Sequence, residues 1–250
     1  RENAKDTQSV DGNNINLNNF YGVYLYGTND TIINGNTIVN DNNGVYIINS
    51  FRTNITSNTI DLNKKFYGIY AYGSPHSTFA QNNLTDNFQG IYLVNSDNTT
   101  ISSNVINRSD VYSLFLHSTT NESNVTSNMF SNGQEGIRIR QSSNGNIFNQ
   151  NTITGHSNYG VHITNANGNL FTNNTIQNNS ASSTYNIYLN SANSTTFNNN
   201  SIINSLAGFF AISSNVLTLN NNTFNSTASP TVQINESTTI LLDNNTIYNN

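Results

Sequence analysis

The chain contains 250 residues, of which 34% are hydrophobic and only 8% are charged, and its formal net charge is −5. Eight Lys and Arg residues in total supply no basic stripe to neutralise phosphates, which argues against nucleic acid as a partner. No apolar run approaches the roughly 20 residues of a membrane span, and the absence of Cys excludes disulfides and thiolate metal sites.

A six-residue repeat organises the sequence after its first nine residues. It consists of an apolar residue, two variable residues, Asn, one variable residue and a second apolar residue, and its eleven copies run from residues 10–15 to residues 242–247. The closing apolar residues are 22 to 26 positions apart, and the longest step includes an expected extra loop at residues 179–184. Disordered Asn-rich chains have no reason to keep such a register. We therefore interpret residues 1–9 as an N-terminal tail and residues 10–250 as one repeat domain.

A second pattern precedes the Asn element from the second copy onward. It is a Gly followed by alternating apolar residues, as in Gly22-Val23-Tyr24-Leu25. Later copies keep the alternation with other residues at the Gly position, namely Ser113, Asn186, Phe209 and Thr231. Period-two alternation in short runs bounded by Gly, Asn and Ser indicates β-strands, and no stretch shows a helical period.

A repeat of about 23 residues cannot bury its own apolar face, so neighbouring repeats must stack. The Leu-x-x-Leu-x-Leu pattern of leucine-rich repeats is absent. We predict an all-β fold, a single-stranded right-handed parallel β-helix (solenoid) of about eleven coils with about 23 residues per coil. Coils stacked about 4.8 Å apart would form a rod roughly 50 Å long. No cap is visible at either end, so we expect either that the sequence is a piece of a longer protein or that its open end coils stack on partners.

The invariant Asn of the repeat has two physical explanations. Asn tolerates the left-handed backbone of a sharp turn, and stacked amides can bond to one another and to the turn backbone. We predict a buried ladder in which Asn104→Ala lowers stability by about 1 to 3 kcal/mol. Its members are Asn36, Asn58, Asn82, Asn104, Asn128, Asn151, Asn174, Asn200, Asn222 and Asn245.

The Gly strands place aromatic side chains on the outside of the sheet. Such a stack can simply stabilise the sheet, or it can form a face that contacts sugar rings, a partner protein or another copy of the chain. The candidate binding residues are Tyr24, Tyr46, Tyr70, Tyr92, Phe115, Arg138, Arg140, His162 and Tyr188, and their outward column is predicted to continue through Ala211 and Gln233. A neighbouring outward column contains Tyr26, Tyr72, His117 and Arg140.

Charged groups on this face are few. The face has one basic patch, for which an anionic sugar is the most natural ligand; its residues are Arg138, Arg140, His117 and His162. No acidic residue is predicted on the two columns, which argues against hydrolysis. Elsewhere, Asp41, Asp61, Asp86, Asp110 and Glu135 are expected to follow the Asn turns as a loose acidic edge, either solvated or a weak calcium site. The four His residues lack metal-ligand spacing, so we predict no metal site. We also predict no cofactor and no catalytic residues.

Sequons for N-glycosylation are frequent. Asn-x-Ser/Thr occurs at fifteen sites, many of which an Asn-rich sequence generates by chance. The candidate sites are Asn29, Asn54, Asn98, Asn121, Asn193 and Asn235.

The combination of Asn-x-Ile turns with strands such as Gly90-Ile91-Tyr92-Leu93 resembles the β-helix repeats of NosD-like proteins. It is also similar to the repeats of large adhesin-like surface proteins of methanogenic archaea and some bacteria. The resemblance covers residues 10–250 and implies the fold. It leaves the activity open, because such repeats occur in lyases, epimerases, adhesins and phage tailspikes. NosD proteins are associated with copper-site maturation, and no ligand cluster in this sequence matches that role.

We therefore predict a non-enzymatic, extracellular structural or adhesive module at the cell surface or in a filament. Its contacts are expected through open coil ends and the aromatic face, with copies of itself, other surface proteins or a polysaccharide as partners. The alternative is a carbohydrate-active enzyme of the lyase or epimerase type, or a carbohydrate-binding module, that uses Arg138 and His162. A cleft that adds an acid to these residues would favour the enzyme, and a flat aromatic face without acids would favour adhesion.

Overall fold

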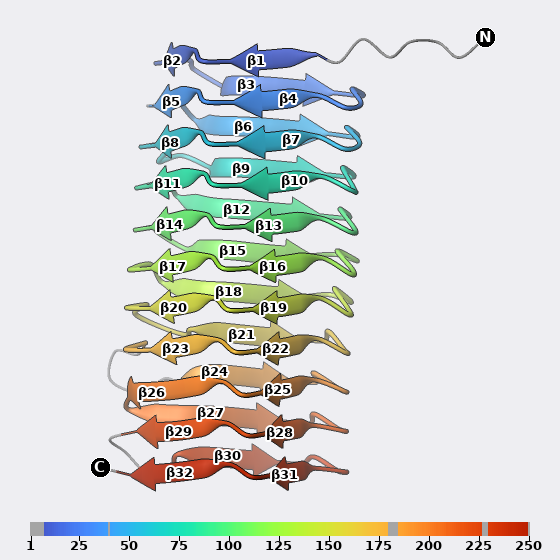
Figure 1. Cartoon of the computed structure of the whole chain (residues 1–250), viewed down its shortest axis with the longest axis vertical. Helices are drawn as coiled ribbons and strands as arrows, with labels where there is room; N and C mark the ends of the chain where they lie inside the picture. Colours follow the sequence, from blue (N-terminus) through green and yellow to red (C-terminus); the bar gives the residue numbers. More distant parts are fainter. Residues whose placement is uncertain (1–7, 40, 180–184, 227–229, 250) are drawn as a thin grey trace, which may run out of the picture.

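The computed structural model describes residues 8–39, 41–179, 185–226 and 230–249. Most of the expected tail at residues 1–9 and all of the expected extra loop except Asn179 lie outside the described residues. The described chain folds into three parallel sheets that run the length of a rod, and successive strands of each sheet come from successive coils (Figure 1). The fold is the predicted right-handed parallel β-helix. No described segment is a helix long and apolar enough to cross a membrane.

Sheet A contains eleven short strands. They are β1 (Ser9–Asp11), β4 (Ile32–Asn34), β7 (Asn54–Thr56), β10 (Thr78–Ala80), β13 (Thr100–Ser102), β16 (Asn124–Thr126), β19 (Ile147–Asn149), β22 (Leu170–Thr172), β25 (Thr196–Asn198), β28 (Thr218–Asn220) and β31 (Leu241–Asp243).

Sheet B also contains eleven strands. They are β2 (Asn14–Asn16), β5 (Thr37–Val39), β8 (Thr59–Asp61), β11 (Asn83–Thr85), β14 (Val105–Asn107), β17 (Met129–Ser131), β20 (Thr152–Thr154), β23 (Thr175–Gln177), β26 (Ser201–Ser205), β29 (Thr223–Ser226) and β32 (Thr246–Asn249).

Sheet C contains ten longer strands and corresponds to the predicted Gly strands. They are β3 (Tyr21–Tyr26), β6 (Asn43–Ile48), β9 (Tyr67–Tyr72), β12 (Gln89–Val94), β15 (Tyr112–His117), β18 (Glu135–Arg140), β21 (Val161–Thr164), β24 (Tyr185–Asn190), β27 (Ala207–Ile212) and β30 (Val232–Asn235).

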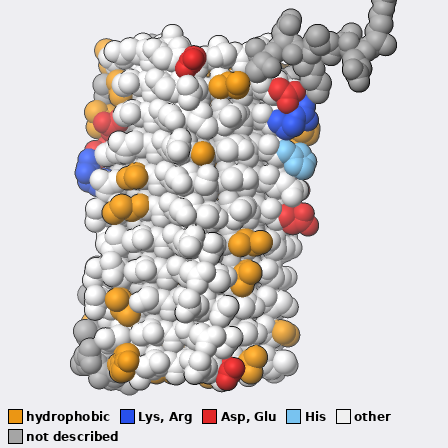
Figure 2. All heavy atoms as spheres, in the orientation of Figure 1, with side chains coloured by type: hydrophobic (Ala, Val, Ile, Leu, Met, Phe, Trp, Pro, Cys, Tyr) orange, Lys and Arg blue, Asp and Glu red, His pale blue; other side chains and the backbone are white. Residues whose placement is uncertain are grey.

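The core lies between the three sheets. A typical coil contributes one inward residue from sheet A, one from sheet B and two from sheet C, such as Ile101, Ile106, Ile91 and Leu93, all with 0% exposure. Burying each such side chain stabilises the fold by about 1.5 to 3 kcal/mol. The outer face of sheets A and B carries mainly uncharged polar groups (Figure 2). The repeated apolar spacing of the sequence is therefore the inward face of every coil.

The Asn ladder lies in the two-residue turn between sheets A and B. Asn104 is 1% exposed, and its backbone N and Nδ2 each donate to Asn128 Oδ1 at 2.9 Å. Its Nδ2 also donates to Phe79 O at 2.8 Å, and its Oδ1 accepts both N–H groups of Asn82. The left-handed backbone belongs to the preceding residue, such as Ser103 with φ +55°. The expectation that the ladder Asn itself adopts this conformation is therefore wrong, because its role is hydrogen bonding.

A second row of stacked polar side chains fills the turn between sheets B and C. Asn63 donates to Asn87 Oδ1 at 2.9 Å, and Asp41 N donates to Asn63 Oδ1 at 3.0 Å. His156 takes the corresponding place further along the rod, where it is 1% exposed. Its Nδ1 accepts from Gly133 N at 3.1 Å and its Nε2 lies 3.2 Å from Phe130 O. Burial lowers the pKa of His156 to about 4, so the ring is neutral in the fold.

The Gly near the start of most sheet C strands is required by close packing. A Cβ on Gly90 would lie 2.4 Å from Ser113 O and 2.6 Å from Ile106 Cγ2. The pairing Ile187 with Phe209 aligns Gly208 with this column. The prediction that Phe209 replaces the Gly is therefore wrong by one residue, and Phe209 is a core residue with 0% exposure.

Candidate functional site

The outer face of sheet C carries three columns of side chains. The residue before the Gly also faces outward, because the Gly and the residue after it are both buried, as Gly44 and Val45 are. Where the residue before the Gly is Tyr, its ring packs on that of the residue two places after the Gly. Tyr21 and Tyr24 have ring centroids 5.0 Å apart, and those of Tyr67 and Tyr70 are 4.7 Å apart. The sequence prediction found two columns and missed this one. The repeated Tyr-Gly pairs at residues 21–22, 67–68 and 159–160 were the available signal.

The strand register defines these columns from one end of the rod to the other. The first column is Tyr21, Asn43, Tyr67, Gln89, Tyr112, Glu135, Tyr159, Tyr185 and Ala207. The second column is Tyr24, Tyr46, Tyr70, Tyr92, Phe115, Arg138, His162, Tyr188, Phe210 and Gln233. The third column is Tyr26, Ile48, Tyr72, Val94, His117, Arg140, Thr164, Asn190, Ile212 and Asn235.

The second column brings together the sequence-predicted aromatic residues. Tyr46 stacks on Tyr70 with centroids 4.5 Å apart, and Tyr92 stacks on Phe115 at 4.7 Å with an interplanar angle of 9°. Ala211 does not belong to the column, since it is buried and Phe210 faces outward instead. The one-residue error arose because Phe209 and Phe210 are both apolar and fit either register.

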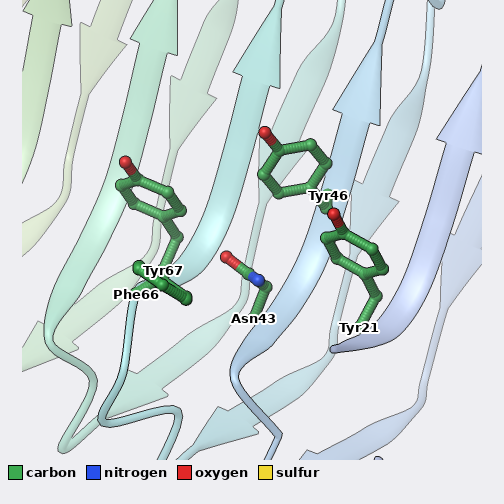
Figure 3. Close-up of a pocket in the computed structure, with 5 residues that line it drawn as sticks. All are labelled: Tyr21, Asn43, Tyr46, Phe66 and Tyr67. Atoms are coloured by element: carbon green, nitrogen blue, oxygen red, sulfur yellow. The ribbon is translucent and has the colours of Figure 1, made fainter. Parts of the chain in front are cut away.

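A pocket opens where the first column has a short side chain. Asn43 stands between Tyr21 and Tyr67, and with Tyr46 and Phe66 these residues line a pocket of about 280 Å³ (Figure 3). Asn43 is 5% exposed, and its Oδ1 has no hydrogen-bond partner in the structure. The pocket therefore has aromatic walls and an amide whose acceptor is unused.

The same alternation recurs along the first column. Asn43, Gln89 and Glu135 occupy every second coil, with a Tyr between each pair and on either side. The Oε1 atom of Gln89 is also buried without a hydrogen-bond partner. The period of two coils is about 9.6 Å. Polar side chains thus alternate with Tyr side chains along the first column.

A charged cluster lies in the middle of the face. Glu135 Oε2 is 3.2 Å from His162 Nδ1 and 3.9 Å from Arg138 Nη1, and Glu135 Oε1 accepts from Asn158 Nδ2 at 3.3 Å. Burial lowers the pKa of both Arg138 and His162, and for His162 the hydrogen bond to Glu135 opposes that shift. No acid lies on the two predicted columns, as expected, but the face does contain one, because Glu135 belongs to the first column, which the prediction missed.

Both ring nitrogens of His162 are engaged. A neutral imidazole that donates from Nδ1 to Glu135 accepts at Nε2, where Thr164 Oγ1 lies at 3.3 Å. The ring also packs edge-on against Tyr159 and Tyr188, with centroids 4.6 Å and 5.0 Å away. His162 is therefore fixed as a structural element of the face, with neither nitrogen left as an unengaged base.

The third column completes the basic patch. Arg140 is exposed, while His117 Nδ1 lies 3.1 Å from the hydroxyl of Tyr92. Burial raises the pKa of Tyr92 to about 12 and lowers the pKa of His117. Both groups are accordingly neutral at physiological pH, and Arg140 supplies the accessible positive charge.

The five acids proposed as a loose edge do not share one surface. Asp41 is buried in the turn between sheets B and C, whereas Glu135 lies on the sheet C face. Asp86 and Asp110 are near Lys64, whose Nζ is 3.8 Å and 3.0 Å from their Oδ1 atoms. The predicted edge is confirmed in part, since Asp61, Asp86 and Asp110 lie around Lys64, and it is wrong for Asp41 and Glu135.

The candidate glycosylation sites differ in exposure. Asn29, Asn98 and Asn235 are exposed, whereas Asn54, Asn121 and Asn193 are partly buried. Asn121 and Asn193 belong to an outer ladder at the corner between sheets C and A, in which Asn144 N donates to Asn121 Oδ1 at 2.8 Å and Asn215 N to Asn193 Oδ1 at 2.7 Å. The three exposed positions remain the predicted acceptors.

The repeat pattern, the Asn ladder and the sheet C face agree with a known family model. Residues 9–186 match the family described as periplasmic copper-binding protein (NosD). The chain belongs to the NosD family. That description places the family in the periplasm, in agreement with an envelope location. No curated protein matches the chain.

Copper ligation does not fit the described residues of this NosD family member. Among them, no group of three or more His, Cys, Asp and Glu side chains is arranged to hold a metal ion. The chain has one Met and no Cys, the soft ligands that Cu(I) prefers. The family description therefore supplies the fold and the compartment, and no copper site is assigned to this chain.

Solved structures show the same fold at low sequence identity. The A-module of a mannuronan C-5 epimerase from Azotobacter vinelandii is 12% identical with a TM-score of 0.74, covering 94% of this chain and 78% of that one. The periplasmic alginate epimerase AlgG is 13% identical with a TM-score of 0.65, covering 87% and 69%. Tailspike protein 2 of bacteriophage CBA120 is 11% identical with a TM-score of 0.69, covering 89% and 39%.

Proposed function

We propose that this chain is a non-enzymatic β-helix of the cell envelope that binds a polysaccharide along the outer face of sheet C, as an adhesive or structural module at the cell surface. The observation that carries the proposal is the pocket at Asn43. Its walls are the rings of Tyr21, Tyr46, Phe66 and Tyr67. Aromatic faces with a few placed polar groups are typical of small-molecule sites. A sugar ring offers both the apolar face and the hydroxyl donors that this pocket can use.

The first column supports a polymer as the ligand. Asn43 Oδ1 and Gln89 Oε1 are unused acceptors two coils apart, a spacing of about 9.6 Å along the rod. A polysaccharide lying parallel to the rod axis would present hydroxyl groups to both positions while its rings stack on the Tyr residues between them. The alternation thus favours an extended strand over a single sugar.

Polysaccharide binding is tested with paired aromatic variants. Tyr46→Ala removes a pocket wall, and Phe51→Ala removes an exposed aromatic side chain that does not belong to the three columns. Affinity electrophoresis against a panel of soluble polysaccharides should show retardation of wild type and Phe51→Ala, and about tenfold weaker retardation of Tyr46→Ala. Because the chain has 13 Tyr and no Trp, quenching of Tyr fluorescence provides a second readout. Equal retardation of all three proteins would contradict the proposal.

A second candidate function is an epimerase or lyase acting on an acidic polysaccharide. It is favoured by Glu135, which adds an acid beside Arg138 and His162, since removal of a proton beside a carboxylate needs a base and a charge neutraliser. Binding without catalysis is preferred because Glu135 and His162 are already hydrogen-bonded and the pocket lies at Asn43 instead. The non-enzymatic proposal predicts that a polyuronate incubated in deuterated water gains no carbon-bound deuterium and no unsaturated ends. Deuterium incorporation that His162→Gln abolishes would establish the enzyme instead.

Protein partners are the competing occupants of the aromatic face. Copies of the chain or another surface protein would cover the same rings. Sedimentation velocity over a range of concentrations separates these cases, because a face reserved for polysaccharide leaves the purified chain monomeric. Self-association that Tyr46→Ala weakens and polysaccharide does not displace would assign the face to assembly.

A further inference from the structure

Charge on the sheet C face is concentrated in a single strand. Among the described strands of this sheet, β18 alone contains Asp, Glu, Lys or Arg, and it contains three of them: Glu135, Arg138 and Arg140. The whole chain has only 21 such residues, from eight Lys and Arg and 13 Asp and Glu. Solubility does not require this concentration on an otherwise uncharged aromatic face. We therefore expect the ligand of the sheet C face to carry a charged group where it meets β18.

Arg138 is buried with its donors unused. It is 9% exposed, its Nη1 is buried without a hydrogen-bond partner, and none of its side-chain N–H groups donates a hydrogen bond to a described residue. Glu135 is the nearest anion at 3.9 Å, and its oxygens already accept from His162 and Asn158. A buried guanidinium has five donors and is costly to leave unpaired. The arrangement lacks an acceptor.

Arg140 lies beside Arg138 on the same face. The two residues are alternate positions of one strand, about 6.7 Å apart along it. Arg140 is exposed, and its guanidinium forms no hydrogen bond or ion pair with a described residue. Rings flank the pair on both sides, with Phe115 in the preceding coil and Tyr188 two coils further on. An exposed and a buried guanidinium thus lie between aromatic side chains on which sugar rings can stack.

We propose that Arg138 and Arg140 bind a carboxylate carried by the polysaccharide, which makes the ligand an acidic, uronate-type chain. This inference rests on the proposed function. Arg offers a planar fork that matches a carboxylate through two parallel hydrogen bonds. Arg140 meets the incoming group at the surface, and Arg138 gains the acceptor that the protein does not provide. Stacking of the sugar ring on the flanking aromatic side chains favours a sugar-borne carboxylate over a free anion.

The test compares polygalacturonate with its methyl ester, which keeps the sugar backbone and removes the charge. Titration calorimetry should show that the wild type prefers the acidic polymer by about tenfold to a hundredfold, as expected for charge-assisted hydrogen bonds. Arg138→Met should abolish this preference while it retains affinity for the methyl ester. Arg52→Gln is the matched control, since Arg52 is paired with Asp30 away from this face; it should bind both polymers as the wild type does.

Thermal melting separates a binding role from a structural one. Without ligand, the double variant Arg138→Met/Glu135→Gln should melt at a higher temperature than the wild type, because it removes the buried guanidinium that lacks a hydrogen-bond acceptor without leaving Glu135 as an uncompensated buried charge. Polygalacturonate should raise the melting temperature of the wild type and leave that of the variant unchanged. A lower melting temperature for the unliganded variant would overturn the assignment, since Arg138 would then hold the fold together.

The outcomes distinguish this inference from the function on which it rests. Equal affinity of the wild type for both polymers, or a preference that survives in Arg138→Met, would overturn the carboxylate site and leave polysaccharide binding intact. Failure of the wild type to bind either polymer would count against both.

Discussion

The turn between sheets A and B and the outer face of sheet C follow opposite rules in the same coils. At the turn, the same side chain recurs in every coil, and Asn104 bonds to Asn82 and Asn128 in the coils on either side. On the face of sheet C, one column passes from Tyr92 through Phe115 to Arg138 within three coils. Both regions have the same stacking geometry, so the difference lies in what each position must satisfy.

The turn between sheets A and B keeps the same residue in every coil because its polar groups are buried. An Asn at the turn must accept from one coil and donate to the next, and its amide carries the acceptor and the donors for both. A residue on the sheet C face only has to cover the strand, so many side chains are compatible with the fold there. Variation on this face is consequently free to serve binding. The contrast predicts that substitutions at the turn cost stability and that substitutions on the face change binding.

The largest expected effect is at the centre of the ladder. Asn104→Ala leaves the N–H groups of Asn82 and the carbonyl of Phe79 without partners in the core. We expect the free energy of unfolding to fall by about 3 kcal/mol, the upper end of the range predicted from the sequence, because several buried groups are unpaired together. Urea denaturation of this variant and of Asn83→Ala, an exposed neighbour of the ladder, measures the difference. Equal midpoints for the two variants would show that the ladder does not stabilise the coils.

His156 gives a pH-dependent test of the turn between sheets B and C. Its pKa is about 4 in the fold against an ordinary 6.5. The neutral ring is thus favoured, so its contribution to stability is complete above pH 6.5 and is lost as the pH falls toward 4. The loss amounts to roughly 3 kcal/mol.

The matched variant for this effect is His156→Asn, since Asn63 and Asn87 occupy the same turn in other coils. Urea denaturation at pH 7.5 and at pH 4.5 should show a steep loss of stability for the wild type and a shallower one for the variant. Parallel pH dependence of both proteins would mean that His156 is protonated in the fold.

The sequence was sufficient for the fold because the core spacing and the ladder Asn recur in every coil. The prediction failed where a position obeys local packing. It assumed strict alternation through the Gly, but the Gly and the residue after it are both buried, and this hid the column of Tyr21, Asn43 and Tyr67. It also shifted the strand at Phe209, since two adjacent Phe residues satisfy either register.

The candidate site was predictable only in outline. The outward column from Tyr24 to Tyr188 followed from alternation alone. The environment of Arg138 did not, because its burial and its missing partners depend on how Glu135, His162 and Asn158 pack around it. The pocket at Asn43 likewise depends on rings from three different coils. Periodicity locates a surface, and only the packed structure shows which groups on it lack partners.

The smallest expected effect lies at the corner between sheets C and A. Arg52 Nε and Nη2 donate to the two carboxylate oxygens of Asp30 at 2.5 Å and 2.8 Å, and both side chains are open to solvent. Water and salt screen such a pair, and ordering two side chains offsets most of its attraction. We expect Arg52→Gln to leave the melting temperature unchanged at both low and high salt in calorimetric scans. A drop comparable to that of Asn104→Ala would break the contrast drawn above, because a solvated corner would then hold the coils together as firmly as the buried turn.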